Sequence, residues 1–239
     1  MTLLTADGIS KNFGGLKALS DISFDVSQGS ILGLMGANGA GKTTLFSVIA
    51  GHVPPSAGKV TFKGRNVTGL RPDQICRVGI CRTFQIVRPF GGLSVHENAA
   101  VSALYGSDRR LTSRAADEAA VAALDAVGLG PARDDLAQSL TLSGQKRLEI
   151  ARALATGAEL VMLDEVMAGL NPAEVDEMIA VLARLRDERA LTFIIVEHVM
   201  GALMKLSDHI LVLDHGQRIA YGTPAEIAGD AHVAGVYFG

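Results

Sequence analysis

The residues with the clearest chemical meaning form one glycine-rich run near the N-terminus. The run fits the G-x-x-x-x-G-K-[ST] pattern and consists of Gly36, Ala37, Asn38, Gly39, Ala40, Gly41, Lys42, Thr43 and Thr44. Backbone N–H groups of such a loop surround phosphates, and the following helix adds positive potential. The pattern predicts that Lys42 reaches the β- and γ-phosphates of a nucleotide and that Thr43 places its hydroxyl on Mg²⁺. The alternative is a chance glycine-rich turn.

A pair of acids follows an apolar run later in the chain. Leu160–Leu163 is expected to be a buried strand, and it delivers Asp164 and Glu165 at its carboxyl end. We expect Asp164 to hold Mg²⁺ and Glu165 to polarise the attacking water as a general base. An apolar run that ends in acids is weak on its own, because many strands end this way. Together with the glycine-rich loop it indicates nucleotide hydrolysis.

The elements that must position these groups alternate between strands and helices. Short β-rich runs are expected at Leu3–Ile9, Ile22–Val26, Ile31–Met35 and Lys59–Phe62, and again at Thr192–Val196, with a hairpin of Ile210–Leu213 and Arg218–Tyr221. A helix should begin inside Gly39–Thr44 and run towards Ala50. Another should cover Glu174–Glu188, with Asn171 as its N-cap. Apolar strands that alternate with helices predict a parallel sheet covered on both faces.

The middle of the chain has a different character. Residues from about 94 to 157 are rich in Ala, Leu and Arg, and Arg114–Val127 has apolar residues at helical spacing. This favours a helical insert of about 94–157 between two parts of an α/β core, 1–93 and 158–239. The alternative is a set of ordinary crossover helices within one sheet.

Composition limits the classes of partner. The net charge is −3 and the pI is near 6.1, so the chain has no overall basic field for nucleic acid. Cys76 and Cys81 are expected to be partly buried, reduced thiols in a reducing cytosol. A metal site would need more ligands, and no Cys or His cluster flanks them in the sequence. Met1–Ser10 has no signal pattern, and no apolar run approaches the roughly 20 residues that span a bilayer.

Four further features narrow the field among phosphate-loop proteins. They are Gln85 in Arg82–Gln85, His198 after the strand Thr192–Val196, Phe13, and the stretch Leu140–Arg147 before Leu148–Leu154. In this order the chain resembles ATP-binding-cassette (ABC) proteins along essentially its whole length. The resemblance implies that Gln85 senses Mg²⁺ and the γ-phosphate, that His198 is the switch histidine, and that Phe13 stacks on adenine. It implies an α/β fold with a mainly parallel sheet, an N-terminal antiparallel β subdomain and an inserted helical subdomain.

One branch of the family is especially similar. Its motifs are matched by Phe13–Leu16, Arg82–Gln85, Arg147–Leu154, Ala168–Pro172, Gly222–Ile227 and the ending Tyr237–Gly239. They resemble the ATPase subunits of importers for branched-chain amino acids. This implies ATP and Mg²⁺ as cofactors, two membrane permease subunits, a second ATP-binding subunit in a homodimer or heterodimer, and indirectly an external solute-binding protein. It implies a peripheral location on the cytoplasmic face of the plasma membrane.

The family signature, usually L-S-G-G-Q, is altered in this chain. Counting back from Ile150 places the signature on Leu140–Gly144. A set of residues that matches L-S-G-G-Q more closely begins two residues later and consists of Leu142, Ser143, Gly144 and Gln145. We expect the second set to contact the γ-phosphate held by a partner subunit. In the first register, Leu142 would replace a glycine and block close backbone approach. Val166 and Asn171 also depart from the usual proline and aspartate.

Two other classes of function compete with transport. Soluble cassette ATPases that act on DNA or ribosomes commonly carry a long coiled coil or paired cassettes, and neither is present here. A small-molecule phosphotransferase could use the same glycine-rich loop. It would leave Gln85, His198 and the signature stretch without a purpose.

Overall fold

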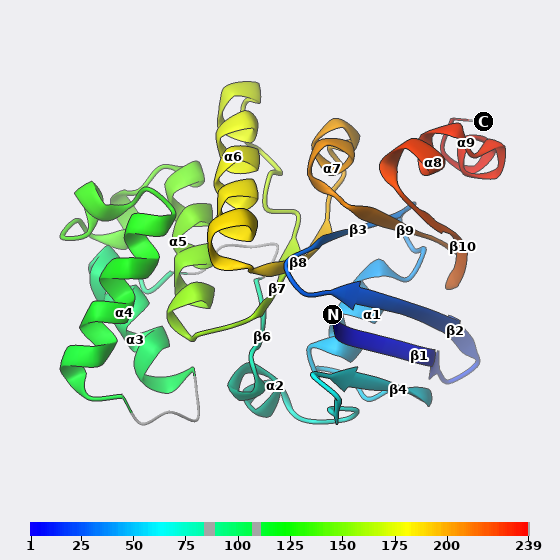
Figure 1. Ribbon diagram of the computed structural model, residues 1–239, viewed down its shortest axis with the longest axis horizontal. Coiled ribbons are helices and arrows are strands. Elements are labelled where there is room, and N and C mark those ends of the chain that lie inside the picture. The colour runs from blue at the N-terminus through cyan, green and yellow to red at the C-terminus, as the bar shows by residue number, and fades with distance from the viewer. Residues whose placement is uncertain (84–88, 107–110, 239) are drawn as a thin grey trace.

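Two β-sheets and their covering helices form the structure, a computed structural model that describes residues 1–83, 89–106 and 111–238 (Figure 1). The first sheet is antiparallel, in the order β2 (Leu16–Ser27), β1 (Thr2–Phe13), β4 (Ala57–Phe62) and β5 (Arg65–Asn66). The second has the order β10 (Gln217–Gly222), β9 (His209–Asp214), β3 (Ile31–Gly36), β8 (Thr192–Val196), β7 (Leu160–Asp164) and β6 (Ile80–Arg82). Its strands are parallel except for β10, which pairs antiparallel with β9. The predicted parallel sheet and terminal hairpin are confirmed.

Alternate residues of the central strands face two separate apolar cores. On β3, Ile31 and Met35 pack into one core, and Leu32 and Leu34 pack into the other. The first core contains helices α5 (Leu142–Ala155), α6 (Pro172–Arg189) and α7 (Met200–Leu206). The second contains α1 (Lys42–Ile49) and the antiparallel sheet. A strand buried on both faces is a rigid support for the loop that follows it.

Three helices between residues 95 and 155 pack on one another at one end of the molecule. They are α3 (Val95–Tyr105), α4 (Ser113–Ala126) and α5. Buried alanines such as Ala99, Ala103, Ala120 and Ala151 line their contacts and allow close approach of the helix axes. The observed helices agree with the predicted helical stretch of about 94–157, while its standing as a separate subdomain stays a prediction.

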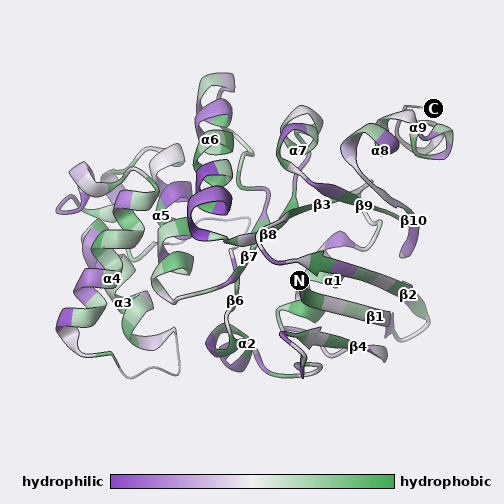
Figure 2. Ribbon diagram, viewed as in Figure 1, coloured by the Kyte–Doolittle hydropathy of each residue, from purple (hydrophilic) through white to green (hydrophobic). Residues whose placement is uncertain are grey.

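Local signals explain several helix boundaries. Asn171 caps α6 by accepting the N–H of Glu174, whose carboxylate in turn accepts the N–H of Asn171, so the predicted cap is confirmed. Figure 2 shows hydrophilic and hydrophobic residues alternating along α6, and its buried face carries Met178 and Leu182. No helix among the described residues combines the length and apolar character that crossing a membrane requires.

Other elements were not predicted from the sequence. They are the strands β5 and β6, the helices α2 (Pro72–Val78), α7, α8 (Pro224–Gly229) and α9 (Ala231–Phe238), and the 3₁₀ turns Gly130–Ala132 and Ala137–Ser139. β6 adds a sixth strand beside β7. It also carries Arg82 to the carboxyl edge of the sheet, where the candidate site lies.

Candidate functional site

The glycine-rich loop connects the end of β3 to the start of α1. Gly41 has a φ of +105°, and a Cβ there would lie 2.9 Å from the carbonyl oxygen of Ala18, so the backbone position requires glycine. Gly41 also stands at the N-cap of α1, where it has no side chain to accept the first N–H groups of the helix. These donors therefore suit an anion such as phosphate.

Lys42 lies folded back over this loop. Its Nζ donates to the carbonyl oxygens of Gly36 at 2.5 Å and of Ala37 at 3.0 Å, and the residue is buried. Burial lowers the pKa of the Lys42 ammonium, and the negative charges of Glu165 and Asp164 partly oppose that shift. The structure thus places a cation inside the loop, next to both predicted acids.

Asp164 ends β7 and pairs with a cation from the neighbouring strand. Arg82 Nη2 donates to Asp164 Oδ2 at 2.8 Å, and both side chains are about nine-tenths buried. Arg82 Nη1 also donates to Ser47 Oγ at 3.1 Å, and its guanidinium lies over the ring of Phe46 at 5.5 Å. Arg82 was not predicted as a site residue, since its only signal was its place before Thr83. It belongs to the site because it holds the predicted metal-binding carboxylate.

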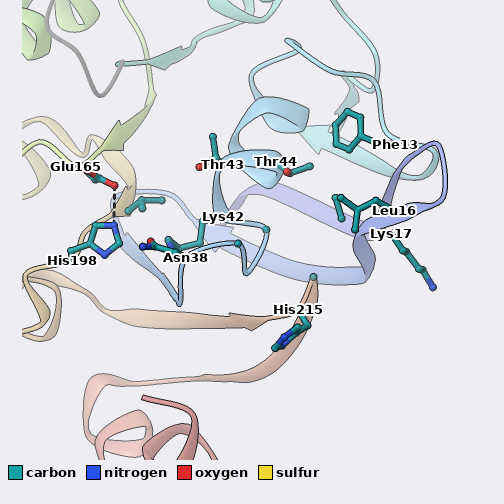
Figure 3. Close-up of a pocket in the computed structure, with 15 residues that line it drawn as sticks. Phe13, Leu16, Lys17, Asn38, Lys42, Thr43, Thr44, Glu165, His198 and His215 are labelled. Atoms are coloured by element: carbon teal, nitrogen blue, oxygen red, sulfur yellow. Dashed lines mark hydrogen bonds and ion pairs between the residues drawn. The ribbon is translucent and has the colours of Figure 1, made fainter. Parts of the chain in front are cut away.

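Glu165 and His198 come from adjacent parallel strands and point toward each other (Figure 3). His198 Nε2 lies 2.9 Å from Glu165 Oε1. The Glu165 N–H donates to the carbonyl oxygen of Val196 at 2.9 Å, which fixes the backbone beside β8. Glu165 has a φ of +53°, a left-handed conformation that is uncommon for residues other than glycine. Two residues 33 positions apart in sequence therefore form one polar pair.

These groups surround a cavity of about 430 Å³. The predicted site residues that line it are Phe13, Asn38, Gly39, Gly41, Lys42, Thr43, Thr44, Glu165 and His198. Gly36, Ala37 and Ala40 lie within the same loop. Phe13 is 48% exposed and, with Leu16, forms an apolar end of the cavity at the turn between β1 and β2. Gln85 lies outside the described residues.

The altered signature stretch lies at the start of α5. Thr141 is the N-cap, and its Oγ1 accepts the N–H of Gly144 at 3.2 Å. Ser143 is only 7% exposed inside the first turn, and Gln145 Nε2 donates back to the carbonyl oxygen of Leu140 at 3.0 Å. Ser143 of the expected set Leu142–Gln145 is therefore buried in the first turn of α5, and the contact of this set with a partner's nucleotide stays a prediction. Thr141 belongs to the other register, Leu140–Gly144, and the preference of Thr for N-caps agrees with its position.

The residue types at the cavity suit a nucleotide with Mg²⁺. The apolar end could accept a base, and the loop N–H groups and Lys42 could accept phosphates. The Thr43 hydroxyl and the Asp164 carboxylate are oxygen ligands of the kind that Mg²⁺ prefers. In the described part of the chain, no three His, Cys, Asp or Glu side chains gather as a metal cluster. A metal here would take most of its ligands from phosphate and water.

Comparison with known proteins decides the family. The profile described as ABC transporter matches residues 19–168. The chain belongs to the ABC transporter family. The LivG protein of Salmonella typhimurium, a high-affinity branched-chain amino acid transport ATP-binding protein, is 39% identical over 99% of this chain and 98% of its own. The BraF protein of Pseudomonas aeruginosa, with the same description, is 36% identical over the same shares.

A solved structure of this family has the same architecture. The crystal structure of the ADP conformation of an ATP-binding cassette of an ABC transporter has a TM-score of 0.91 and 30% identity, and the match covers 100% of this chain and 99% of that one. The resemblance predicted from the sequence is confirmed, and so is the α/β cassette fold. The cassette is the ATPase part of the family.

Proposed function

We propose that this chain binds and hydrolyses ATP to power import of branched-chain or other hydrophobic amino acids through partner permease subunits. The observation that carries the proposal is the contact between Glu165 and His198 at the mouth of the cavity that contains Lys42. A carboxylate held by an imidazole beside a phosphate loop is suited to polarise a water. The amino acid class rests on the similarity to LivG and BraF over nearly the whole chain.

Each residue of the cavity has a role in the proposed reaction. The loop from Gly36 to Thr44 holds the triphosphate, and Lys42 exchanges its backbone carbonyl partners for phosphate oxygens. Thr43 and Asp164 would hold Mg²⁺, which neutralises phosphate charge when it is bound. Glu165 accepts the proton of the attacking water, and His198 orients that carboxylate. Phe13 covers the base.

A second cassette completes the proposed site. One chain carries one phosphate loop and one α5 start, and in the proposed dimer these come from different subunits. We propose that the Thr141 hydroxyl, rather than that of Ser143, faces the partner's nucleotide, because Thr141 stands at the helix N-terminus. Leu142 is 44% exposed there and also packs against Gly169, where an added Cβ would meet Leu142 Cδ2 at 3.1 Å. The partner is a second copy or a related chain.

A hollow beside β6 supports the proposed permease partner, and the proposed peripheral location at the membrane's cytoplasmic face depends on that partner. It has a volume of about 330 Å³ and lies between β6 and the helices α3 and α5. Phe90 and Tyr105 line it and are 50% and 77% exposed, a pair of large apolar side chains suited to a partner. Arg152 also lines this hollow, and its guanidinium lies over the Phe90 ring at 5.3 Å.

The test is purification of the tagged chain from its own membranes in mild detergent, followed by identification of the proteins that co-elute. Permease subunits and a second cassette are expected. Cells with Glu165→Gln in place of the parent chain should lose uptake of radiolabelled leucine while the complex still assembles. A chain that co-elutes with no membrane protein, with and without ATP, would refute the transport role. Unchanged leucine uptake in a variant that still assembles but has lost ATP hydrolysis would refute the substrate class.

A further inference from the structure

A buried lysine outside the cavity contacts the loop that carries Glu165. Lys146 is 4% exposed and lies on the first turns of α5. Its Nζ donates to the backbone carbonyl oxygen of Glu165 at 2.9 Å. The bond joins α5 to the turn at the carboxyl end of β7, two elements that the cavity itself does not join. An ammonium buried this deeply is rare unless it is paired, so its location requires an explanation.

The surroundings of Lys146 are acidic. Burial lowers the pKa of its ammonium, and the negative charges of Glu197, Glu149 and Glu165 oppose that shift. Glu197 is itself buried, and its Oε1 accepts the N–H of Met167 at 2.7 Å. Two buried side chains of opposite charge therefore hold the same turn, one through the carbonyl of Glu165 and the other through the N–H of Met167.

The backbone of that turn needs support. Glu165 adopts the left-handed conformation, with φ +53°, although it is not glycine. Its carbonyl oxygen accepts the N–H of Ala168 at 3.2 Å in addition to Lys146 Nζ. The carbonyl orientation and the side-chain direction of one residue are linked through φ and ψ. A cation that holds the carbonyl therefore also directs the carboxylate toward His198.

We propose that Lys146 is a positioning residue, which holds Glu165 in its left-handed conformation and so aims the Glu165 carboxylate at the water-activating position. This inference rests on the proposed function, in which Glu165 is the general base. Lys146 belongs to the helix whose N-cap is Thr141, so a displacement of α5 moves the Glu165 carbonyl with it. The position of α5 thus sets the geometry of the base.

The experiment compares steady-state ATP hydrolysis of the parent chain with Lys146→Met, which keeps the length of the side chain but removes the donor. We expect kcat to fall by about 10- to 100-fold, because small misplacement of a catalytic group has effects of that size. The KM for ATP and the binding of a fluorescent ATP analogue should stay within about twofold, since Lys146 does not touch the cavity. Lys146→Arg, which retains a cationic donor, should recover part of kcat.

A control variant tests whether loss of any bond from a cationic side chain to a backbone carbonyl is enough to lower kcat. Arg184 Nη2 on α6 donates to the carbonyl oxygen of Ala126 at 2.8 Å, a cation-to-carbonyl bond that is exposed and does not involve the Glu165 turn. Arg184→Met should leave kcat unchanged. A fall in kcat equal to that of Lys146→Met would overturn the proposal. Parent-like kcat in folded Lys146→Met would overturn it as well.

A double-mutant cycle with Glu165→Gln tests whether Lys146 affects kcat by positioning Glu165 or by a general disturbance of the structure. Once the base is removed, Lys146→Met should lower the residual rate no further, so the two losses are not additive. Full additivity would show that Lys146 acts through something other than Glu165. Normal turnover in Glu165→Gln alone would instead refute the proposed role of Glu165. If Lys146→Met does not fold, the same cycle with Lys146→Gln gives the same decision.

Discussion

The loop that follows β3 presents backbone N–H groups at the carboxyl edge of the sheet. The loop that follows β7 presents a side-chain carboxylate at the same edge. The first, residues 36–41, has glycine at Gly36, Gly39 and Gly41, and its shape comes from backbone freedom. The second, residues 165–169, has a single glycine, Gly169, and places Glu165 at a φ of +53°. Both loops follow strands that are buried on both faces, β3 and β7, so the difference lies in the loops and not in the strands that support them.

The difference follows from what each loop must offer to a ligand. A loop that presents backbone N–H groups can use glycine, because no side chain is needed. A loop that presents a carboxylate cannot, so the unfavourable backbone conformation, which costs on the order of 1–3 kcal/mol, must be balanced by other contacts. Lys146 and Glu197 supply these contacts from outside the loop. The backbone freedom of the glycine loop comes from residues within the loop itself. The contacts that hold the Glu165 loop come from residues elsewhere in the sequence, which the fold brings to it.

The largest effect is expected from the first loop. Lys42→Ala removes the cation that reaches the phosphates and should abolish ATP turnover, with a loss of at least about 10²- to 10³-fold. Steady-state hydrolysis and nucleotide binding measure it. Normal hydrolysis by a folded variant would remove Lys42 and the phosphate-loop assignment from the proposed site.

A substitution at Glu165 in the second loop should lower ATP hydrolysis without lowering ATP binding. Glu165→Gln keeps the shape of the side chain but removes the proton acceptor, so kcat should fall by about 10²- to 10⁴-fold while ATP still binds. Single-turnover hydrolysis and binding of a fluorescent ATP analogue measure the two quantities. A loss of ATP binding in Glu165→Gln as large as that in Lys42→Ala would contradict the role of the second loop in hydrolysis alone.

A smaller effect is expected when the backbone freedom of the first loop is removed. Gly41→Ala would force a Cβ toward the Ala18 carbonyl at a φ of +105°, and should lower the free energy of unfolding by about 1–3 kcal/mol. Gly39→Ala is the matched control, because its Cβ would meet no atom within 4 Å. Denaturant unfolding should give a smaller loss for Gly39→Ala. Equal losses would show that contact with Ala18 is not what makes Gly41 necessary.

The smallest effect concerns the support of the second loop and depends on pH. Burial raises the pKa of Glu197 above its ordinary 4.5, and the N–H of Met167 and the charge of Lys146 oppose the shift. Between pH 4.5 and the raised value, the folded state keeps a proton that the unfolded state has released, so stability falls as pH rises through this window. Glu197→Gln should remove this contribution while keeping an acceptor for Met167. Identical pH profiles of the melting temperature in both proteins would contradict it.

Sequence predicted the elements whose signals are local. The glycine-rich loop, the acids after β7 and the cap at Asn171 all depend on residues within a few positions of one another. The pairs that complete the site do not. Arg82 and Asp164 are 82 positions apart, and Lys146 reaches Glu165 only because the start of α5 lies near the turn that follows β7. These contacts arise from tertiary packing, for which a single sequence carries no periodic signal.

The altered signature is a stretch for which the sequence left two registers open. The residue types favoured the set that begins at Leu142, which is the first residue of α5, and Thr141 of the other register is its N-cap. β6 was not predicted from the sequence. Three residues, Ile80–Arg82, are too short for alternation to be seen, and the strand exists because β7 offers an edge for it.

The pair between Arg82 and Asp164 has an electrostatic consequence for nucleotide entry. A triphosphate that enters the cavity carries several negative charges toward the carboxylates of Asp164 and Glu165. Arg82 is a resident counterion for one of them, so the field that the phosphates meet is less repulsive than the count of acids suggests. Because the guanidinium also binds Ser47 on α1, the helix behind the phosphate loop and the acidic strand are joined by a single fixed positive charge.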